Sequence, residues 1–211
     1  MRNFTKGNKK SLLATSLVGL VVAVSSNANA NNVLDNARFY VGAGVGYNKY
    51  VLSNDYKNRV ESSTNKGSVK KKSANVLLPV LGVKFQENYG AEFGYAFHNK
   101  LEFDGNKSGN LRLRNSFVDL MGYMPMMTQV DLIGGLGIGR MTIKQKSSLN
   151  AIGNGTSYNK FGLRAKIGAQ YAFDNNWNVR GLVGYQRVGD KDGKQSIKSM
   201  QSANVDVTYL I

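Results

Sequence analysis

Apolar side chains occupy every second position along much of this chain, and this alternation limits the folds that it can adopt. Between positions 161 and 173, seven apolar residues alternate with glycine, alanine, glutamine and basic residues. A period of two is that of a β-strand, whose successive side chains point to opposite faces. The turn-forming residues Asp174, Asn175 and Asn176 then precede a second alternating segment that starts at Trp177. The two segments predict an antiparallel hairpin.

The same alternation recurs along the chain and predicts eight strands of roughly nine to thirteen residues, the length that a tilted transmembrane strand needs. The segments are 39–47, 75–85, 89–98, 115–123, 131–139, 161–173, 177–186 and 202–211. Short and long connections alternate between them, which is typical of transmembrane barrels with short periplasmic turns and long external loops. The expected short connections are 86–88, 124–129 and 174–176, and the long ones are 50–74, 99–113, 143–159 and 188–198.

The first thirty residues have the three parts of a secretory signal peptide. Four basic residues (Arg2, Lys6, Lys9 and Lys10) precede a short apolar run at 12–24, and Ala28-Asn29-Ala30 provides a cleavage site. The alternative is an uncleaved anchor or a buried helix. After Ala30 no apolar run reaches the length of a membrane-spanning helix, which excludes a helix-bundle membrane protein. We therefore expect a helical signal peptide at 1–30 and one barrel domain at 31–211.

Aromatic residues near the strand ends favour a membrane barrel over a soluble barrel, whose apolar side chains would point inward. Aromatic side chains concentrate at the two lipid–water boundaries of transmembrane barrels. The residues expected in these girdles are Phe39, Tyr47, Tyr89, Phe97, Phe173, Trp177, Tyr185 and Tyr209. The predicted class is all-β, an eight-stranded antiparallel transmembrane β-barrel.

The opposite strand faces carry four basic and four acidic residues. An eight-stranded barrel is just wide enough inside for side chains. Opposite charges there are expected to pair, and inward glycines leave room for the long side chains. The expected lumen network contains Lys84, Glu92, Asp119, Asp131, Arg164, Lys166, Arg180 and Asp206.

Four segments resemble the OmpA-like and opacity-protein-like family of outer-membrane barrels. They are the opening strand FYVGAGVGY at 39–47, Ala91–Tyr95 (AEFGY), Gly134–Gly139 and the amphipathic last strand, and the resemblance covers residues 37–211. It implies a bacterial outer-membrane location and a last strand read by the barrel-assembly machinery. Family members commonly end in Phe, whereas this chain ends in Ile. The residues of the expected assembly strand are Val205, Val207, Tyr209 and Ile211.

Catalytic and cofactor sites are not expected. The chain has no cysteine, and His98 is its single histidine, which we interpret as a rim side chain at a strand end. The glycine runs at 42–46 and 135–139 repeat every second residue, whereas a dinucleotide-binding loop needs a different spacing and a following helix. We therefore expect no cofactor and no metal, and a membrane-embedded lipid-modifying enzyme around His98 remains an alternative.

The chain is strongly basic, and part of this charge falls on expected external loops. The first long loop contains the basic residues Lys66, Lys70, Lys71 and Lys72. Nucleic acid is not an expected partner of loops outside the cell. The expected partners are outer-membrane lipid, including lipopolysaccharide phosphates, and host glycans or matrix proteins; the alternative is solvated loops with no specific ligand. The sequence thus predicts a structural and surface-interaction barrel, such as an adhesin or surface antigen, with a small pore or transporter as the alternative.

Export gives the first test. We expect cleavage after Ala30, leaving Asn31 as the first residue of the mature protein, because the basic, apolar and small-residue parts coincide there. Mass spectrometry of the protein extracted from outer membranes checks this. A mature mass that still includes Met1, or that begins well before Asn31, would contradict the expectation.

Overall fold

The computed structural model describes residues 37–54, 58, 72–85, 87–99, 101–102, 109–147, 157–189 and 197–211. The predicted signal peptide, with its cleavage site, lies outside the described residues, as do Lys66, Lys70 and Lys71 of the basic loop. Lys72 was expected in that loop but is the first residue of a strand. Among the described residues, no helix is long and apolar enough to cross a membrane.

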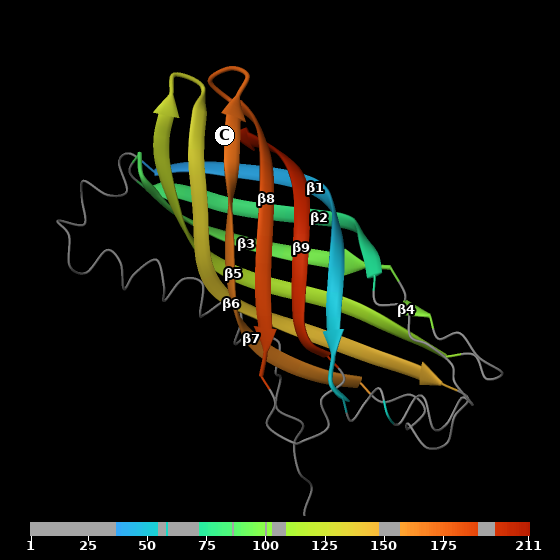
Figure 1. The fold of residues 1–211 in the computed structure, drawn as a ribbon. Coiled ribbons are helices and arrows are strands. Elements are labelled where there is room, and N and C mark those ends of the chain that lie inside the picture. The colour runs from blue at the N-terminus through green and yellow to red at the C-terminus, as the bar shows by residue number, and fades with distance from the viewer. Residues whose placement is uncertain are drawn as a thin grey trace, which may run out of the picture. The chain divides into compact units, whose positions relative to one another are not determined.

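Eight long antiparallel strands form a closed barrel (Figure 1). They are β1 (Ala37–Leu52), β2 (Lys72–Phe85), β3 (Tyr89–His98), β5 (Gly109–Met127), β6 (Val130–Ser147), β7 (Ser157–Ala172), β8 (Trp177–Val188) and β9 (Ile197–Leu210). The two-residue β4 (Leu101–Glu102) follows β3 and also pairs with β5.

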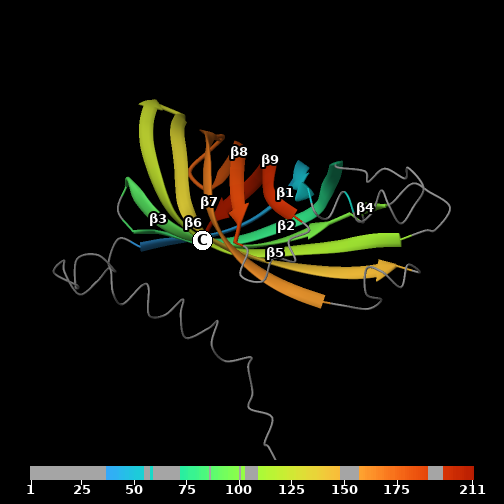
Figure 2. The same cartoon turned by 60° about the horizontal axis from the view of Figure 1, so that its bottom comes forward.

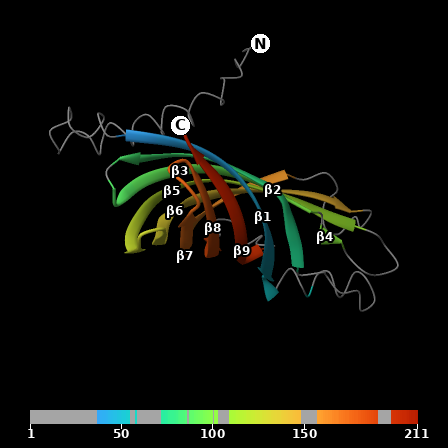
Figure 3. The same ribbon diagram turned by 90° about the horizontal axis from the view of Figure 1, so that it is seen from above.

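Two pairings close the sheet: β1 with β9, and β3 with β5. β1 lies between β2 and the last strand, β9, as Figures 2 and 3 show from two directions. β3 pairs with β5 from Tyr89↔Gly122 to Phe97↔Arg114, which joins the two ends of the strand order. The predicted eight-stranded antiparallel barrel is therefore confirmed.

Alternating burial confirms the expected faces. In β3 every second residue from Gly90 to His98 is buried, and the residues between them are exposed or half-buried. In β7 the apolar set that starts at Phe161 points outward, and Arg164 and Lys166 belong to the inward set. A barrel with apolar residues outside and charged residues inside is suited to lipid and not to water.

Several strands are longer than the sequence predicted. β5 has 19 residues and β6 has 18, and both continue into segments that we expected to be loops. The expected bounds were wrong because, at the strand ends that lead to the long connections, the apolar residues change from the outward face to the inward face. There Leu113, Met141 and Ile143 are buried, while their neighbours Arg112 and Lys144 are exposed. The outward apolar pattern that marks a strand in the sequence ends where this reversal begins.

The reversed ends enclose a group of buried apolar side chains, which we call the outer apolar cluster. It consists of Tyr50, Leu52, Leu113, Met141, Ile143, Val188, Ile197 and Met200. All of these residues lie on the strand ends that lead to the long connections, opposite the short turns. The sequence analysis did not predict this cluster.

The turn expected at 124–129 is shorter than predicted, because β5 continues through Pro125 and leaves Thr128 and Gln129 as the turn. Proline lacks the N–H that a strand interior normally donates. The N–H of Tyr123 points toward β3 and donates to the carbonyl oxygen of Asn88, the residue before that strand, at 2.8 Å. The backbone of Pro125, two residues further on, faces the same side, beyond the end of the β3 ladder at Gly122. The missing donor therefore costs no ladder bond.

The β7–β8 turn is fixed by its own side chain, as expected of an Asp-Asn-Asn sequence. The Asp174 carboxylate accepts the N–H groups of Asn176 at 2.8 Å and Trp177 at 2.7 Å. These two bonds stabilise the ionised form and lower the pKa of Asp174 below its ordinary value.

Candidate functional site

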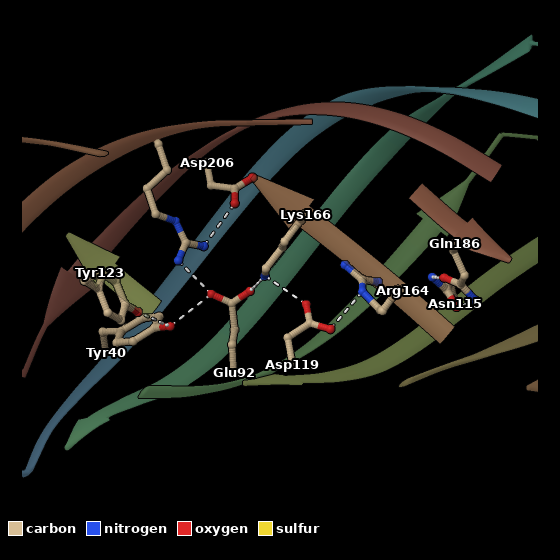
Figure 4. Close-up of polar contacts among 10 residues, drawn as sticks. Tyr40, Glu92, Asn115, Asp119, Tyr123, Arg164, Lys166, Gln186 and Asp206 are labelled. Carbon is tan, nitrogen blue, oxygen red and sulfur yellow. Dashed lines mark hydrogen bonds and ion pairs between the residues drawn. The ribbon is translucent and has the colours of Figure 1, made fainter. Parts of the chain in front are cut away.

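Six charged side chains form a continuous series of ion pairs of alternating sign inside the barrel (Figure 4). Arg164 Nε lies 2.9 Å from Asp119 Oδ1, and Lys166 Nζ lies 3.0 Å from Asp119 Oδ2. Lys166 also pairs with Glu92. Arg180 then contacts Glu92 Oε2 at 2.6 Å and Asp206 Oδ2 at 3.0 Å. We call this series the interior ion-pair chain.

Strand register explains why the charges must alternate. Glu92 on β3 lies directly opposite Asp119 on β5, and like charges in that position repel one another. Lys166 on β7 contacts both carboxylates and so compensates the repulsion. Arg180 and Asp206 are themselves directly opposite on β8 and β9. The chain thus joins both sides of the barrel through side chains that cross its interior.

Glycines on neighbouring strands make room for these long side chains. Gly44 faces Asp206, and Gly137 faces both Asp119 and Arg164 in the register. A Cβ atom at Gly44 would overlap Asp206 Oδ1, and one at Gly137 would overlap Asp119 Oδ1. The period-two glycine runs therefore leave space for charged side chains.

Aromatic rings complete the surroundings of the chain, and the sequence analysis did not assign them to it. The Tyr40 hydroxyl donates to Glu92 Oε2 at 3.0 Å and lies 3.2 Å from the Tyr123 hydroxyl. The Arg164 guanidinium lies 3.6 Å from the centroid of the Phe117 ring, a favourable cation–π distance. Glu92 and Arg180 are each only 1% exposed, so the ion pairs are shielded from solvent. The alternation places Tyr40 and Phe117 on the inward face, and this was the one sign in the sequence that they could contact the interior charges.

Lys84 and Asp131, also expected in the lumen network, stand apart from the interior ion-pair chain among the described residues. Lys84 Nζ lies 4.6 Å from the centroid of the Tyr123 ring. Asp131 Oδ2 accepts a hydrogen bond from Gln170 Nε2 at 3.5 Å. Both lie at the barrel end that carries the short turns. The structure therefore brings six of the eight expected residues together.

The aromatic residues expected at the lipid boundaries are all exposed on the outward face. Three same-strand pairs each span nine residues, counting both members: Phe39 and Tyr47, Tyr89 and Phe97, and Trp177 and Tyr185. Nine to eleven residues is the length of a transmembrane β-strand. Phe173 and Tyr209 lie at the short-turn end, where the Tyr209 ring is 4.8 Å from the Trp177 ring.

The expected assembly residues Val205, Val207, Tyr209 and Ile211 are also exposed on the outward face. They lie at the strand that joins the two ends of the chain, because β9 pairs with both β1 and β8. The last residue contributes to this closure, since Ile211 N donates to Phe39 O at 2.8 Å. Recognition of this strand by the barrel-assembly machinery stays a prediction.

His98 ends β3, as expected, but its side chain is buried and is not a free rim group. Its Nδ1 atom lies 2.8 Å from the Tyr50 hydroxyl and 3.0 Å from Asn48 Nδ2. A second buried polar pair, Asn115 and Gln186, is joined by a hydrogen bond of 2.8 Å. Within the described residues, no group of three or more His, Cys, Asp or Glu side chains is placed to hold a metal ion.

Neutralising one carboxylate of the interior chain should destabilise the barrel far more than neutralising an exposed one. We expect Glu92→Gln to lower the free energy of unfolding by about 3–5 kcal/mol, because Lys166 and Arg180 lose their shared partner. The matched control is Glu87→Gln in an exposed turn, which should change it by less than about 0.5 kcal/mol. Urea unfolding in lipid vesicles can be followed through Trp177, the only tryptophan. Equal unfolding midpoints for the two variants would contradict the prediction.

Comparison with known proteins extends these observations. Residues 14–209 match a family model described as outer membrane protein beta-barrel domain. No curated protein matches the sequence. Among solved structures, Neisserial surface protein A is similar at 13% identity and a TM-score of 0.56, over 83% of this chain and 98% of that chain. OprG from Pseudomonas aeruginosa gives 13% and 0.55, over 83% and 96%. Ail, the attachment invasion locus protein of Yersinia pestis, gives 15% and 0.51, over 83% and 97%.

At these identities the solved structures show a shared fold, and the family model shows the relationship. It spans most of the chain and agrees with the resemblance found in the sequence. This chain belongs to the family of outer-membrane protein β-barrel domains and is a protein of the bacterial outer membrane.

Proposed function

We propose that this protein is a closed barrel with a structural and surface-interaction role, which presents basic loops at the cell surface and neither conducts solutes nor catalyses a reaction. The observation that carries the proposal is the interior ion-pair chain, which crosses the barrel from β7 through β3 to β8 and β9. Eight strands enclose only enough space for side chains. Charges held in this way plug the barrel, whereas an excess of one sign would favour a water-filled channel.

The outer apolar cluster adds a second barrier in series. Its residues come from β1, β5, β6, β8 and β9 and are each at most 5% exposed. Ions passing along the interior would have to leave water at this cluster and then break ion pairs further along. Burying an unpaired charge costs several kcal/mol. The two barriers together favour a surface role over the alternative of a small pore or transporter.

The geometry at His98 supports a role without catalysis. A membrane-embedded enzyme would need a nucleophile or carboxylate positioned by the histidine. Instead, the Nδ1 atom of His98 faces Tyr50 and Asn48 next to the outer apolar cluster. These contacts are consistent with a buried histidine that stabilises the strand ends.

Conductance tests the closed barrel. We expect the purified protein to give no stable large pore in planar bilayers, because the interior is filled by paired charges and apolar side chains. A trimeric porin reconstituted in the same bilayers serves as the positive control. Sustained ohmic conductance from this protein would overturn the closed-barrel proposal and favour the small-pore alternative.

Sulfated glycans are the surface ligands that we propose for the basic loop, with Lys66, Lys70 and Lys71, together with Lys72 at the start of β2. Clustered lysines attract sulfate and phosphate groups over a range set by the ionic strength. The Yersinia pestis Ail barrel has been solved in complex with the heparin analogue sucrose octasulfate, and that structure is similar to this chain at 14% identity and a TM-score of 0.50. The similarity lends support to a sulfated ligand, such as a host glycan, for this protein.

Changing Lys70, Lys71 and Lys72 together to Gln should weaken binding to heparin by more than about tenfold at low salt, since each basic contact contributes about 1 kcal/mol. Binding of the lipid-reconstituted protein to immobilised heparin gives the affinity, and desulfated heparin is the ligand control. Heat-modifiable migration on gels verifies that the variant is folded. Equal heparin affinity of variant and parent would remove the proposal.

A further inference from the structure

Four basic side chains gather on the outward face of β5 and β6, at the end that leads to the long connections. Arg112, Arg114 and Lys144 are exposed, and Arg140 is half-buried. We call these four residues the β5–β6 basic patch. None of them belongs to the basic loop or to the interior ion-pair chain. They lie where the outward face of the barrel changes from apolar to polar.

The register brings these like charges close together. Arg112 lies directly opposite Lys144. Arg114 lies opposite Thr142, and the next pair on the same face is Ser116 opposite Arg140. Directly opposite side chains on one face of a sheet have Cβ atoms about 4.5–5.5 Å apart, and like charges there are destabilising. No acidic side chain faces outward on the described parts of β3, β5, β6 and β7, and Glu102 of the short strand β4 lies opposite Asn110, two positions from Arg112. On β3, β5, β6 and β7 the repulsion is therefore not compensated by an outward acidic side chain.

Neighbouring aromatic residues indicate where the patch lies relative to the membrane. Arg114 is paired with Phe97 and Arg140 with Phe161, and each guanidinium lies 6.0 Å from the centroid of that ring. Outward aromatic rings mark the lipid–water boundary. On the membrane side of these pairs the outward surface is apolar, with Ile138 and Leu163 exposed and directly opposite one another. Cations thus border an apolar surface at headgroup level.

We infer that the β5–β6 basic patch binds the phosphate groups of a phosphorylated glycolipid in the outer leaflet. Such a lipid has two parts that match the surface: acyl chains for the apolar face at Ile138 and Leu163, and phosphates for the adjoining cations. Arginine side chains are suited to bidentate contacts with phosphate, and the two cations of the patch that lie at the lipid boundary, Arg114 and Arg140, are both arginines. A soluble glycan lacks the acyl chains. The inference rests on the outer-membrane location and not on the proposed glycan-binding loop.

Binding of a defined lipid tests this inference. The full mature protein in a zwitterionic detergent is titrated with diphosphoryl lipid A and, separately, with lipid A from which both phosphates have been removed, and bound lipid is measured by native mass spectrometry. The patch variant carries Arg112→Gln, Arg114→Gln and Lys144→Gln. The matched control carries Lys49→Gln, Arg187→Gln and Lys198→Gln, which removes the same charge from exposed outward positions on β1, β8 and β9.

In the control set, Lys49 lies opposite Gln201 and Arg187 lies opposite Ser199, so neither basic residue faces another cation in the register. We expect the patch variant to lose at least about tenfold in affinity for diphosphoryl lipid A and the control less than about twofold. The parent should bind the dephosphorylated lipid at least about tenfold more weakly than the phosphorylated one. Equal losses in the two variants, an unchanged patch variant, or equal binding of the two lipids would overturn the inference.

Thermal unfolding supplies a second measurement. Without lipid, the patch variant should unfold at the same temperature as the parent or higher, because the change removes repulsion between Arg112 and Lys144. Diphosphoryl lipid A should raise the unfolding temperature of the parent and leave that of the patch variant nearly unchanged. A patch variant that is less stable than the parent without lipid would show that these residues support the fold, and would contradict the inference. Heparin affinity should be the same in patch variant and parent, which separates this result from the test of the basic loop.

Discussion

The requirement that every backbone polar group in lipid has a hydrogen-bond partner determines the rest of this structure. A strand edge exposed to hydrocarbon leaves N–H and C=O groups unsatisfied, at several kcal/mol each, so a sheet can cross a membrane only when it is closed. Here closure depends above all on the β1–β9 ladder, which joins the first described strand to the last. Once the sheet is closed, each residue has a fixed side. Every side chain must then suit either lipid or a narrow interior, and successive residues of each strand alternate between these two environments.

The narrow interior turns electrostatic balance into a condition of folding. Glu92 and Asp119 face each other across β3 and β5, and neither has bulk water to reduce the repulsion. Lys166 and Arg180 pair with them from β7 and β8, strands that are not neighbours of β3 or β5. The same contacts that stabilise the fold therefore occupy the space through which a solute would pass. Replacing a buried ion pair with apolar residues can leave stability unchanged, so a network of this size points to a requirement for a filled, uniquely registered interior.

Much of the fold could be predicted from the sequence because lipid enforces a simple alternation. The runs from Phe161 and from Trp177 revealed strands and faces without any knowledge of their partners. The strand ends could not be found in the same way, since Leu113 and Ile143 point inward where the outward face is already basic. The inward position of Glu92 and Arg180 followed from the alternation, but their pairing did not, because it depends on the stagger between strands that are not neighbours. Tyr40 and Phe117 were missed as partners because their inward position alone does not show which charged side chain an aromatic residue contacts.

The reversal of alternation beyond the aromatic boundary connects the two unexpected features of the molecule. Above that boundary the outside of the strands meets headgroups and water instead of acyl chains, so Arg112 and Lys144 are favoured outside and Leu113 and Ile143 inside. The inward apolar side chains give the protruding strand ends a core of their own, which the ion pairs further down cannot provide. A protruding sheet with its own core is a rigid base for the connections that leave it. Arg112 and Lys144 point outward, toward the headgroup layer, where the membrane carries fixed negative charge. The change of polarity that extends the strands therefore also brings a basic surface to the lipid headgroups.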